Sequence, residues 1–251
     1  ILPWVEDKLD ELGGETPVLF DEAEGIDFEA VADTQPDVIL AAYSGLTQDD
    51  YDTLTKIAPV VAYPDIAWGT SWQELTVMNG TALGLKDEAE TLVDDLTTHL
   101  DELTGAYPDI AGKTTLFSSF DATDLSQIGF YSTADPRPLF LEDLGLTPAA
   151  TVAEQSKGTD QFWITNSTEE IERFSDLQVL VTYGDDATLA AMQADPLLSR
   201  IPAVASGAVV VLPASNDPLA AAANPSPLSI TDPLTSEYVD MIGAAAAKAS
   251  S

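Results

Sequence analysis

The chain contains no cysteine and a single histidine, His99, among its 251 residues. Without cysteine it can form no disulfide, zinc–thiolate site or thiol nucleophile. One histidine cannot supply a two-histidine metal motif, and the Ser and Asp residues around it show no spacing that indicates a catalytic triad. A Gly-rich phosphate loop and a G-x-S-x-G elbow are also missing. We therefore expect a protein that is not an enzyme, with no catalytic residue, no metal ligands and no intrinsic cofactor; paired carboxylates are the enzymatic alternative.

Basic residues are scarce, with nine Lys and Arg against 43 Asp and Glu, for a formal charge of −34. Such a surface repels nucleic-acid phosphates and anionic lipid head groups, so neither is an expected partner. No run of about eighteen apolar residues is present that could span a membrane. The length fits either one large α/β domain or two lobes.

The longest uninterrupted helical pattern covers Lys86–Tyr107. Its apolar residues recur at helical spacing and form one stripe, which consists of Ala89, Leu92, Val93, Leu96, Leu100 and Leu103. About twenty residues make a rod of roughly 30 Å, longer than a crossover helix in a small sheet requires. We interpret it as a connector between two lobes; the alternative is a long surface helix of one domain.

Strands and helices alternate on both sides of this helix, which favours parallel strands with right-handed crossovers. The first half predicts helix Leu2–Leu12, strand Thr16–Phe20, helix Phe28–Thr34 capped by Asp27, strand Val38–Ala42, helix Gln48–Ile57 capped by Thr47, strand Val60–Tyr63 and a helix from the capping box Ser71–Glu74 to Leu83. The second half predicts strands Thr114–Phe120 and Gln127–Tyr131, helix Pro138–Leu144, a helix that runs from the capping box Ser167–Glu170 to Phe174, strand Val179–Thr182, helix Asp186–Met192, strand Ala208–Leu212, loop Pro213–Pro227 with one turn of helix, and helix Thr231–Ala247.

Several segments in this order resemble the ferric-siderophore substrate-binding proteins of ABC importers. Those of the first half are EAVADTQPDVIL (Glu29–Leu40), YDTLTKIAPVV (Tyr51–Val61), AWGTSWQE (Ala67–Glu74) and ALGLKDEAETLVDDL (Ala82–Leu96). Those of the second half are YSTADPRPLFLEDLGL (Tyr131–Leu146), STEEIERFSDLQVLV (Ser167–Val181) and DPLLSRIPAVASGAVVVL (Asp195–Leu212). Their succession around one long helix is more specific than any single motif.

The resemblance implies a class III periplasmic-binding-protein-like fold: two α/β lobes with mainly parallel sheets, joined by one long rigid helix. The lobes are expected at residues 1–84 and 108–251, with the helix at 85–107. Family members usually begin with a further strand and helix, so the N-terminal lobe is expected to be incomplete. The implied location is extracytoplasmic, with a lipid anchor before Ile1, and we expect a monomer.

The implied function is capture of a ferric siderophore in the interlobe cleft and its delivery to an ABC permease for iron uptake. One alternative is a haem-binding protein of the same class with Tyr43 or Tyr131 as axial ligand. The other is an acidic cell-surface domain, not involved in transport, that binds protein or glycan.

Ligands of open α/β sheets bind beyond the carboxyl ends of strands, which directs attention to the loops after Ala42, Tyr63 and Tyr131. These loops and the polar stretch around Trp163 supply the candidate ligand-binding residues Tyr43, Ser44, Trp68, Trp72, Phe130, Tyr131 and Trp163. Aromatic side chains there could enclose a bulky complex at little entropic cost. The alternative for each is core packing, which we favour for Trp72 and Phe130 but not for Trp163.

Arg137 lies in a loop between a strand and a helix, where its guanidinium could bind carbonyl, hydroxamate or carboxylate oxygens of an iron chelate. The alternative is a structural salt bridge with one of the many acids. A tris-catecholate ferric complex is strongly anionic and calls for several basic groups, which nine scattered Lys and Arg can hardly provide. We therefore expect a ferric hydroxamate or mixed-donor siderophore.

Glu29 and Glu169 occupy matching places in the two halves, each in the first turn of a helix that precedes a buried strand. In the resembled family, surface glutamates at these places dock on arginines of the permease. The alternative is simply that an acid is favourable near a helix N-terminus.

Overall fold

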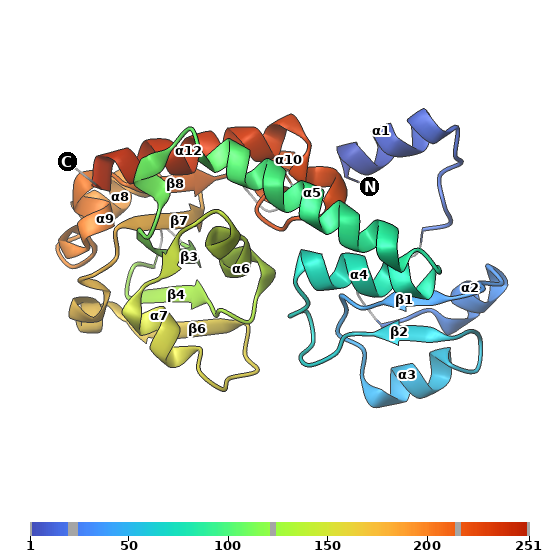
Figure 1. Cartoon of the computed structure of the whole chain (residues 1–251). Coiled ribbons are helices and arrows are strands. Elements are labelled where there is room, and N and C mark those ends of the chain that lie inside the picture. The colour runs from blue at the N-terminus through green and yellow to red at the C-terminus, as the bar shows by residue number, and fades with distance from the viewer. Residues whose placement is uncertain (1, 20–24, 121–123, 214–216, 250–251) are drawn as a thin grey trace. The chain divides into compact units, whose positions relative to one another are not determined.

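A computed structural model describes residues 2–19, 25–120, 124–213 and 217–249 of the chain (Figure 1). The chain divides into two compact units, Ile1–Val93 and Asp94–Ser251, and the division falls inside helix α5 (Lys86–Thr104). The lobe boundaries at residues 84 and 107 stay a prediction. Across the described ranges, no helix is long and apolar enough to cross a membrane.

The first unit contains two parallel strands, β1 (Ile39–Ala41) and β2 (Val60–Ala62), with Ile39 opposite Val60. Its helices are α1 (Pro3–Leu12), α2 (Phe28–Asp33), α3 (Gln48–Leu54) and α4 (Trp72–Ala82). Side-chain caps fix three of these helix starts. Asp27 accepts a hydrogen bond from the Ala30 amide, Thr47 and Asp50 form a reciprocal capping box, and Ser71 accepts from the Glu74 amide. Because caps satisfy the free amides of the first turn, the predicted starts are confirmed.

The strand predicted over Thr16–Phe20 is wrong for the residues that the structure describes. Thr16 to Leu19 adopt no regular structure, and Phe20 lies outside the described residues. Val18 and Leu19 are 68% and 63% exposed. An apolar run therefore exists here without a neighbouring strand to pair with, and apolar character alone does not form a ladder.

The second unit is built on a mixed sheet with the strand order β6-β4-β3-β7-β8, and β5 pairs with β3. Strand β3 is parallel to both β5 and β7, and β8 is parallel to β7. Strand β4 runs antiparallel to both β3 and β6. The strands are β3 (Thr114–Ser119), β4 (Gln127–Tyr131), β5 (Thr147–Pro148), β6 (Trp163–Ser167), β7 (Val179–Tyr183) and β8 (Val209–Leu212).

Helices complete this unit. They are η1 (Pro108–Ile110), α6 (Pro136–Asp143), α7 (Ala150–Gln155), η2 (Thr168–Phe174), α8 (Thr188–Ala194), η3 (Leu198–Arg200), α9 (Pro202–Ser206), α10 (Pro218–Ala221), α11 (Pro227–Ile230) and α12 (Pro233–Ala249). The one turn of helix predicted within the loop Pro213–Pro227 is α10, and residues 214–216 of that loop lie outside the described part.

Side chains alternate between the two faces of the sheet. One face contributes Leu116, Ile128, Phe130 and Leu180 to a buried core that includes Ile171, Phe174 and Met192. Alternation puts Phe117, Tyr131, Val181 and Tyr183 on the opposite face, the side on which α6 packs against β3 and Phe140 contacts Tyr238 of α12. The second face is therefore the one that carries aromatic side chains at the strand ends.

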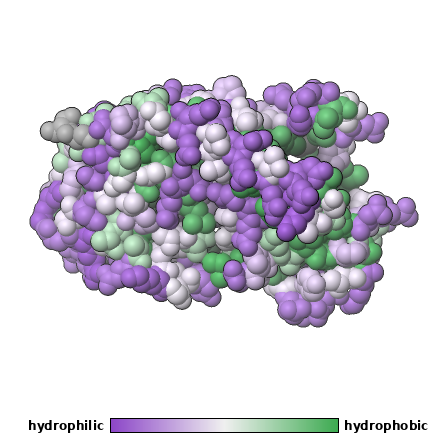
Figure 2. All heavy atoms as spheres, in the orientation of Figure 1, coloured by the Kyte–Doolittle hydropathy of each residue, from purple (hydrophilic) through white to green (hydrophobic). Residues whose placement is uncertain are grey.

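The long helix α5 follows its predicted stripe. Ala89, Leu96 and Leu100 are buried, whereas Leu92 is 40% exposed. Hydrophilic residues cover the side of α5 turned to the viewer in Figure 2. Beyond its C-terminus, Tyr107 donates a hydrogen bond of 2.6 Å to Asp240 of α12. This bond fixes the end of the helix to the second unit.

Candidate ligand-binding site

Four aromatic side chains gather on one face of the second unit's sheet. Tyr131 and Trp163 stand directly opposite each other in the β4–β6 ladder, with ring centroids 4.8 Å apart and planes at 73°. Phe117 lies 5.6 Å from Tyr131 and 5.2 Å from Tyr183, again edge to face. Such contacts favour a fixed arrangement of the rings. They form a rigid apolar surface in which two phenol hydroxyls and one indole N–H are embedded.

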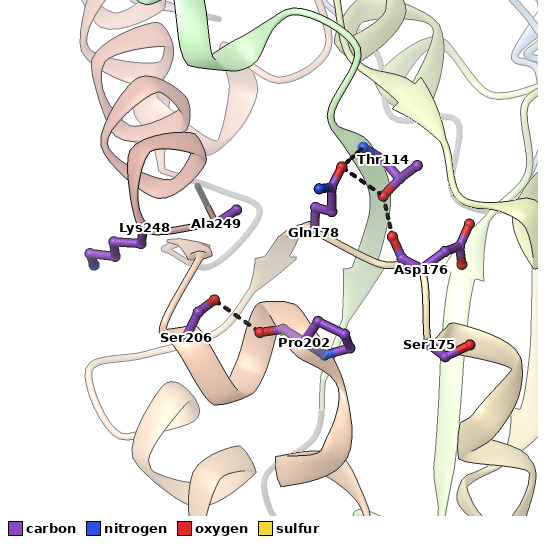
Figure 3. A pocket seen from close by; sticks show the side chains of 8 residues that line it. All are labelled: Thr114, Ser175, Asp176, Gln178, Pro202, Ser206, Lys248 and Ala249. Carbon is purple, nitrogen blue, oxygen red and sulfur yellow. Dashed lines mark hydrogen bonds between the residues drawn. The ribbon is translucent and has the colours of Figure 1, made fainter. Parts of the chain in front are cut away.

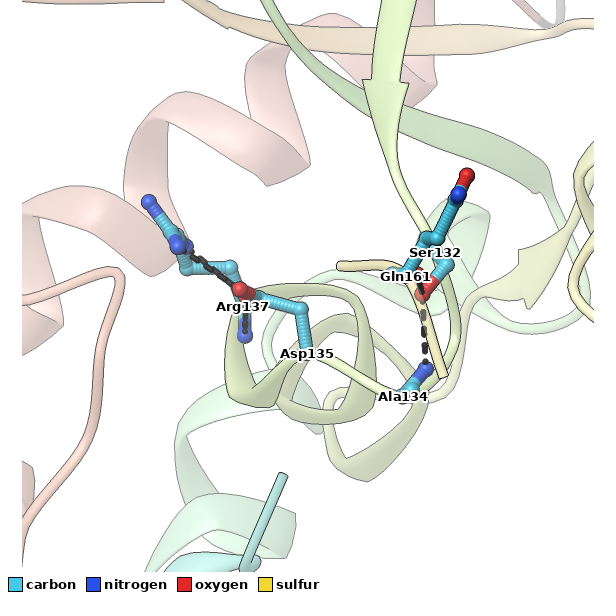
Figure 4. Close-up of polar contacts among 5 residues, drawn as sticks. All are labelled: Ser132, Ala134, Asp135, Arg137 and Gln161. Carbon is cyan, nitrogen blue, oxygen red and sulfur yellow. Dashed lines mark hydrogen bonds and ion pairs between the residues drawn. The ribbon is translucent and has the colours of Figure 1, made fainter. Parts of the chain in front are cut away.

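Arg137 covers this surface from the first turn of α6 and does not lie in the predicted loop before that helix. Its guanidinium carbon lies 3.6 Å from the centre of the Tyr131 ring. Asp135, the N-cap residue of α6, accepts a hydrogen bond from the Arg137 backbone amide. Its two carboxylate oxygens also accept hydrogen bonds from the guanidinium, at 2.8 Å from Nε and 2.7 Å from Nη2 (Figure 4). The Arg137 side chain is 20% exposed and that of Asp135 only 3%. The arginine is therefore both paired with an acid and accessible.

Electrostatics keep this arginine charged. Burial acts to lower the pKa of Arg137, but the hydrogen bonds and charge of Asp135, helped by Tyr131 and Tyr183, outweigh it and raise the pKa above its usual value. Burial raises the pKa of Tyr183, against a hydrogen bond and charge from Arg137 that lower it. At neutral pH the site thus contains a neutral phenol beside a charged guanidinium.

Backbone and side-chain bonds tie the loop after β4 to the segment before β6. The Ser132 amide donates to the Phe162 carbonyl at 2.9 Å, and the Ser132 hydroxyl donates to the Gln161 carbonyl at 2.7 Å. The same hydroxyl accepts from the Ala134 amide at 3.3 Å (Figure 4). These bonds hold the Tyr131–Trp163 pair and the start of α6 in one frame.

In the first unit, Tyr43 and Trp68 meet at the loop that follows β1. Their rings lie 5.2 Å apart at 79°. Trp68 is 46% exposed and has a φ of 61°, a left-handed conformation that costs a non-glycine residue about 1 kcal/mol or more. Its amide donates to the Ser44 carbonyl at 3.0 Å. Tyr43, Ser44 and Trp68 also line a pocket of about 340 Å³ beside β1.

Two of the residues predicted to bind ligand belong to the core. Phe130 has no exposed surface and packs edge to face against Phe174, 6.4 Å away. Trp72, the first residue of α4, is only 3% exposed. Neither side chain therefore offers the exposed surface that a ligand contact requires. Core packing, the alternative favoured for both, describes them correctly.

Trp163 is half-buried and stands at the start of strand β6. The β4–β6 ladder, in which Trp163 is paired with Tyr131, determines which side chains surround it.

Glu29 is exposed in the first turn of α2 and Glu169 is exposed in the first turn of η2. The helix predicted from Ser167 is a 3-10 helix, in which Ser167 caps the Glu169 amide rather than that of Glu170. Their role stays a prediction.

Sequence reasoning missed Phe117, Asp135 and Tyr183. Tyr183 directly follows the predicted strand Val179–Thr182, so the rule that selected Tyr43 could have found it. Asp135 carried the signal of an N-cap two residues before Arg137. Phe117 had none, since a phenylalanine inside an apolar strand reads as core.

A pocket of about 520 Å³ lies elsewhere in the second unit, at the start of β3 and β7 (Figure 3). Its polar lining is largely bonded to itself or to nearby backbone: Thr114 bonds to Asp176 and Gln178, Ser206 donates to the Pro202 carbonyl at 2.9 Å, and Lys248 donates to the Gly207 carbonyl at 3.2 Å. Of the described residues that line it, none is aromatic. A bulky aromatic-bound ligand therefore fits this pocket poorly.

Comparison with known proteins identifies relatives of this chain. The family model described as "Periplasmic binding protein" matches residues 2–216. The substrate-binding protein PiaA of an iron uptake ABC transporter from Streptococcus pneumoniae is 41% identical over 99% of this chain and 84% of its own, with a TM-score of 0.89. PiaA in complex with ferrichrome gives 41% identity, 99% and 82% coverage and a TM-score of 0.91.

A more distant structure, FhuD2 of Staphylococcus aureus with bound ferrioxamine B, is 18% identical over 98% of this chain and 88% of its own, with a TM-score of 0.67. At this identity the likeness concerns the fold. No curated protein sequence matches the chain.

Proposed function

Because the chain belongs to the periplasmic binding protein family, we propose that it captures a ferric siderophore and delivers it to an ABC permease for iron uptake. It works outside the cytoplasm, and its task is binding rather than catalysis. The observation that carries the proposal is the stack of Trp163, Tyr131 and Arg137 on the sheet of the second unit. The similarity of the chain to PiaA, whose structure holds ferrichrome, supports the ligand class.

The charges of the stack favour a hydroxamate over a catecholate. Asp135 neutralises Arg137, so the cluster carries little net positive charge. A trianionic tris-catecholate would have to enter a strongly acidic protein without compensating cations, which is costly. A neutral ferric trihydroxamate meets aromatic faces instead. Asp135 uses two of the five guanidinium N–H donors and Tyr183 accepts from the same group, so the donors that are left can serve chelate oxygens.

The proposed ligand contacts are Tyr131, Arg137 and Trp163 in the second unit, with Tyr43, Ser44 and Trp68 in the first. Trp68 supports this choice because its strained backbone and exposed indole have no evident role in folding. Phe117 and Tyr183 support the second set from beneath.

A titration tests the ligand class. Intrinsic tryptophan fluorescence is followed while ferrichrome, ferrioxamine B, a ferric tris-catecholate and haem are added separately. The proposal predicts saturable quenching by ferrichrome and weaker binding of the tris-catecholate. Saturable quenching by haem alone would favour a haem-binding protein, and no binding of any chelate would refute the proposal.

Delivery to the permease is assigned to Glu29 and Glu169. Both carboxylates are exposed, and each stands in the first turn of its helix. Reversal of both charges, Glu29→Arg with Glu169→Arg, is expected to abolish uptake of ferric siderophore in cells while the affinity for the chelate is kept. Asp33→Arg, an exposed acid at the other end of α2, is the matched control. Loss of affinity in the double variant would contradict the assignment.

A monomeric state and a lipid anchor before Ile1 are parts of the same proposal. Mass spectrometry of the mature protein extracted from cell membranes tests the anchor. Light scattering of the purified chain tests the monomer.

A further inference from the structure

Both of the proposed ligand-binding tryptophans lie directly on a glycine. A Cβ atom built on Gly129, in the middle of β4, would stand 2.1 Å from Cζ2, 2.6 Å from Cε2 and 3.0 Å from Cη2 of Trp163. A Cβ on Gly45, in the loop after β1, would stand 2.5 Å from Nε1 and 3.1 Å from Cε2 of Trp68. Both indoles therefore rest on main chain, at a distance that no other residue permits.

Backbone conformation does not explain either glycine. Neither Gly129 nor Gly45 is among the glycines with positive φ, so both have backbones that other residues adopt. Glycine inside a strand costs roughly 0.5–1 kcal/mol relative to alanine. The remaining reason for a strand glycine is close approach of another group, and here that group is an indole.

The register explains how Trp163 reaches Gly129. Trp163 is paired with Tyr131 across the ladder, whereas Gly129 is paired with Thr165. Gly129 is thus the diagonal neighbour of Trp163 on the same face, and the indole leans along the strands to cover it. From this position against the backbone, the indole makes its edge contact with Tyr131, with ring centroids 4.8 Å apart.

The atoms that would clash belong to the outer end of each side chain. Trp163 is half-buried and Trp68 is 46% exposed, so a Cβ atom at either glycine displaces an indole that is partly open to solvent, at the cost of its edge contact with a tyrosine. Gly80 differs, because its Cβ would meet the Ala89 Cβ at 2.4 Å and the Leu85 carbonyl at 3.1 Å between two helices. A methyl group at Gly129 or Gly45 therefore displaces an indole side chain, whereas one at Gly80 disturbs the packing between two helices.

We infer that Gly129 and Gly45 are positioning residues, which let the indoles of Trp163 and Trp68 lie against the backbone and so leave room for a bulky iron chelate over the outer faces of the indoles. The inference rests on the proposed function. The glycines touch no ligand and act only through the tryptophans. An alanine at either position raises the indole into the volume that the chelate occupies.

The test is a pair of double-mutant cycles read out by ferrichrome affinity. Gly129→Ala is expected to weaken binding about tenfold or more, which corresponds to about 1.4 kcal/mol. In a Trp163→Ala background the same glycine substitution is expected to have no further effect, because no indole is left to displace. Gly45→Ala with Trp68→Ala forms the second cycle. Gly14→Ala, whose Cβ would meet only Leu9 at 3.2 Å and beyond, is the control.

Thermal melts and near-ultraviolet circular dichroism accompany the titrations. The glycine variants should melt close to the wild type while the aromatic dichroism changes, and that change should vanish in the tryptophan-free backgrounds. Equal weakening with and without the tryptophan, or unchanged ferrichrome affinity in both glycine variants, would overturn the inference and leave the proposed function intact. A wild-type protein that binds no ferric siderophore would refute the proposed function and this role together.

Discussion

Arg137 stacks on Tyr131 with its guanidinium carbon 3.6 Å from the ring centre, while Asp135 grips the guanidinium edge with two oxygens. The planar group is thereby fixed in orientation, with one face on an aromatic ring and its charge balanced. Lysine could supply the charge but neither the stacking nor the two-point grip. The pair thus depends on arginine chemistry rather than on a positive charge alone.

Arg137→Lys is accordingly expected to weaken ferric hydroxamate binding about tenfold or more, since the ammonium cannot stack on Tyr131 or hold a fixed pose. Isothermal titration with ferrichrome measures the change. Arg200→Lys is the matched control, because Arg200 is exposed and pairs with Glu172 on the surface. An affinity equal to that of the wild type in Arg137→Lys would remove Arg137 from the site.

The tryptophans should divide into those that report binding and those that do not. Replacement of Trp163 or Trp68 by Phe is expected to reduce the amplitude of fluorescence quenching by ferrichrome, because these indoles are partly exposed. Trp72→Phe should preserve the fractional quenching of the remaining signal, since Trp72 is 3% exposed. Quenching that depends on Trp72 alone would contradict the chosen contacts.

Phe130 should matter for stability and not for binding. Phe130→Ala empties a fully buried position beside Phe174 and is expected to lower the free energy of unfolding by about 3–5 kcal/mol. Urea denaturation gives this value, and titration of the folded variant with ferrichrome should give the wild-type affinity. A stable variant with weakened binding would return Phe130 to the site.

Tyr238 predicts a pH-dependent stability. Its side chain is fully buried, and its hydroxyl has no hydrogen-bond partner among the residues described. Tyr238→Phe should therefore raise the free energy of unfolding at pH 7, by about 1 kcal/mol or more. Burial, and then Tyr183, raise the pKa of the Tyr238 phenol in the folded state.

The unfolded chain loses the phenol proton first as pH rises above about 10, so the wild type loses stability there. The variant should lose less over the same alkaline range. Urea denaturation at pH 7 and above pH 10 measures both effects. A variant less stable than the wild type at pH 7, or an equal alkaline loss in both proteins, would count against this account of Tyr238.

Local signals explain how far sequence reasoning reached. Asp27, Thr47 and Ser71 fixed helix starts because capping involves residues two or three positions apart. The helix over Lys86–Thr104 followed from an apolar period that needs no knowledge of its neighbours. Thr16–Phe20 failed because a strand depends on a partner that its own residues do not specify.

The site residues divide in the same way. Tyr43 and Arg137 were found because they come after predicted strands and Tyr131 because it ends one, at the edge where loops gather in open sheets. The pairing of Tyr131 with Trp163 depends on an antiparallel register between segments more than thirty residues apart, and no local pattern contains it. The closeness of Gly129 to an indole is likewise a consequence of that register.

Competition between ligand classes tests the central claim most directly. The wild-type protein is equilibrated by dialysis with iron-55-labelled ferrichrome, in the presence and absence of an excess of unlabelled ferric tris-catecholate or unlabelled ferrichrome. The account predicts saturable binding that unlabelled ferrichrome displaces and the tris-catecholate does not. Absence of saturable ferrichrome binding, or displacement by the tris-catecholate at lower concentration than by ferrichrome, would contradict it.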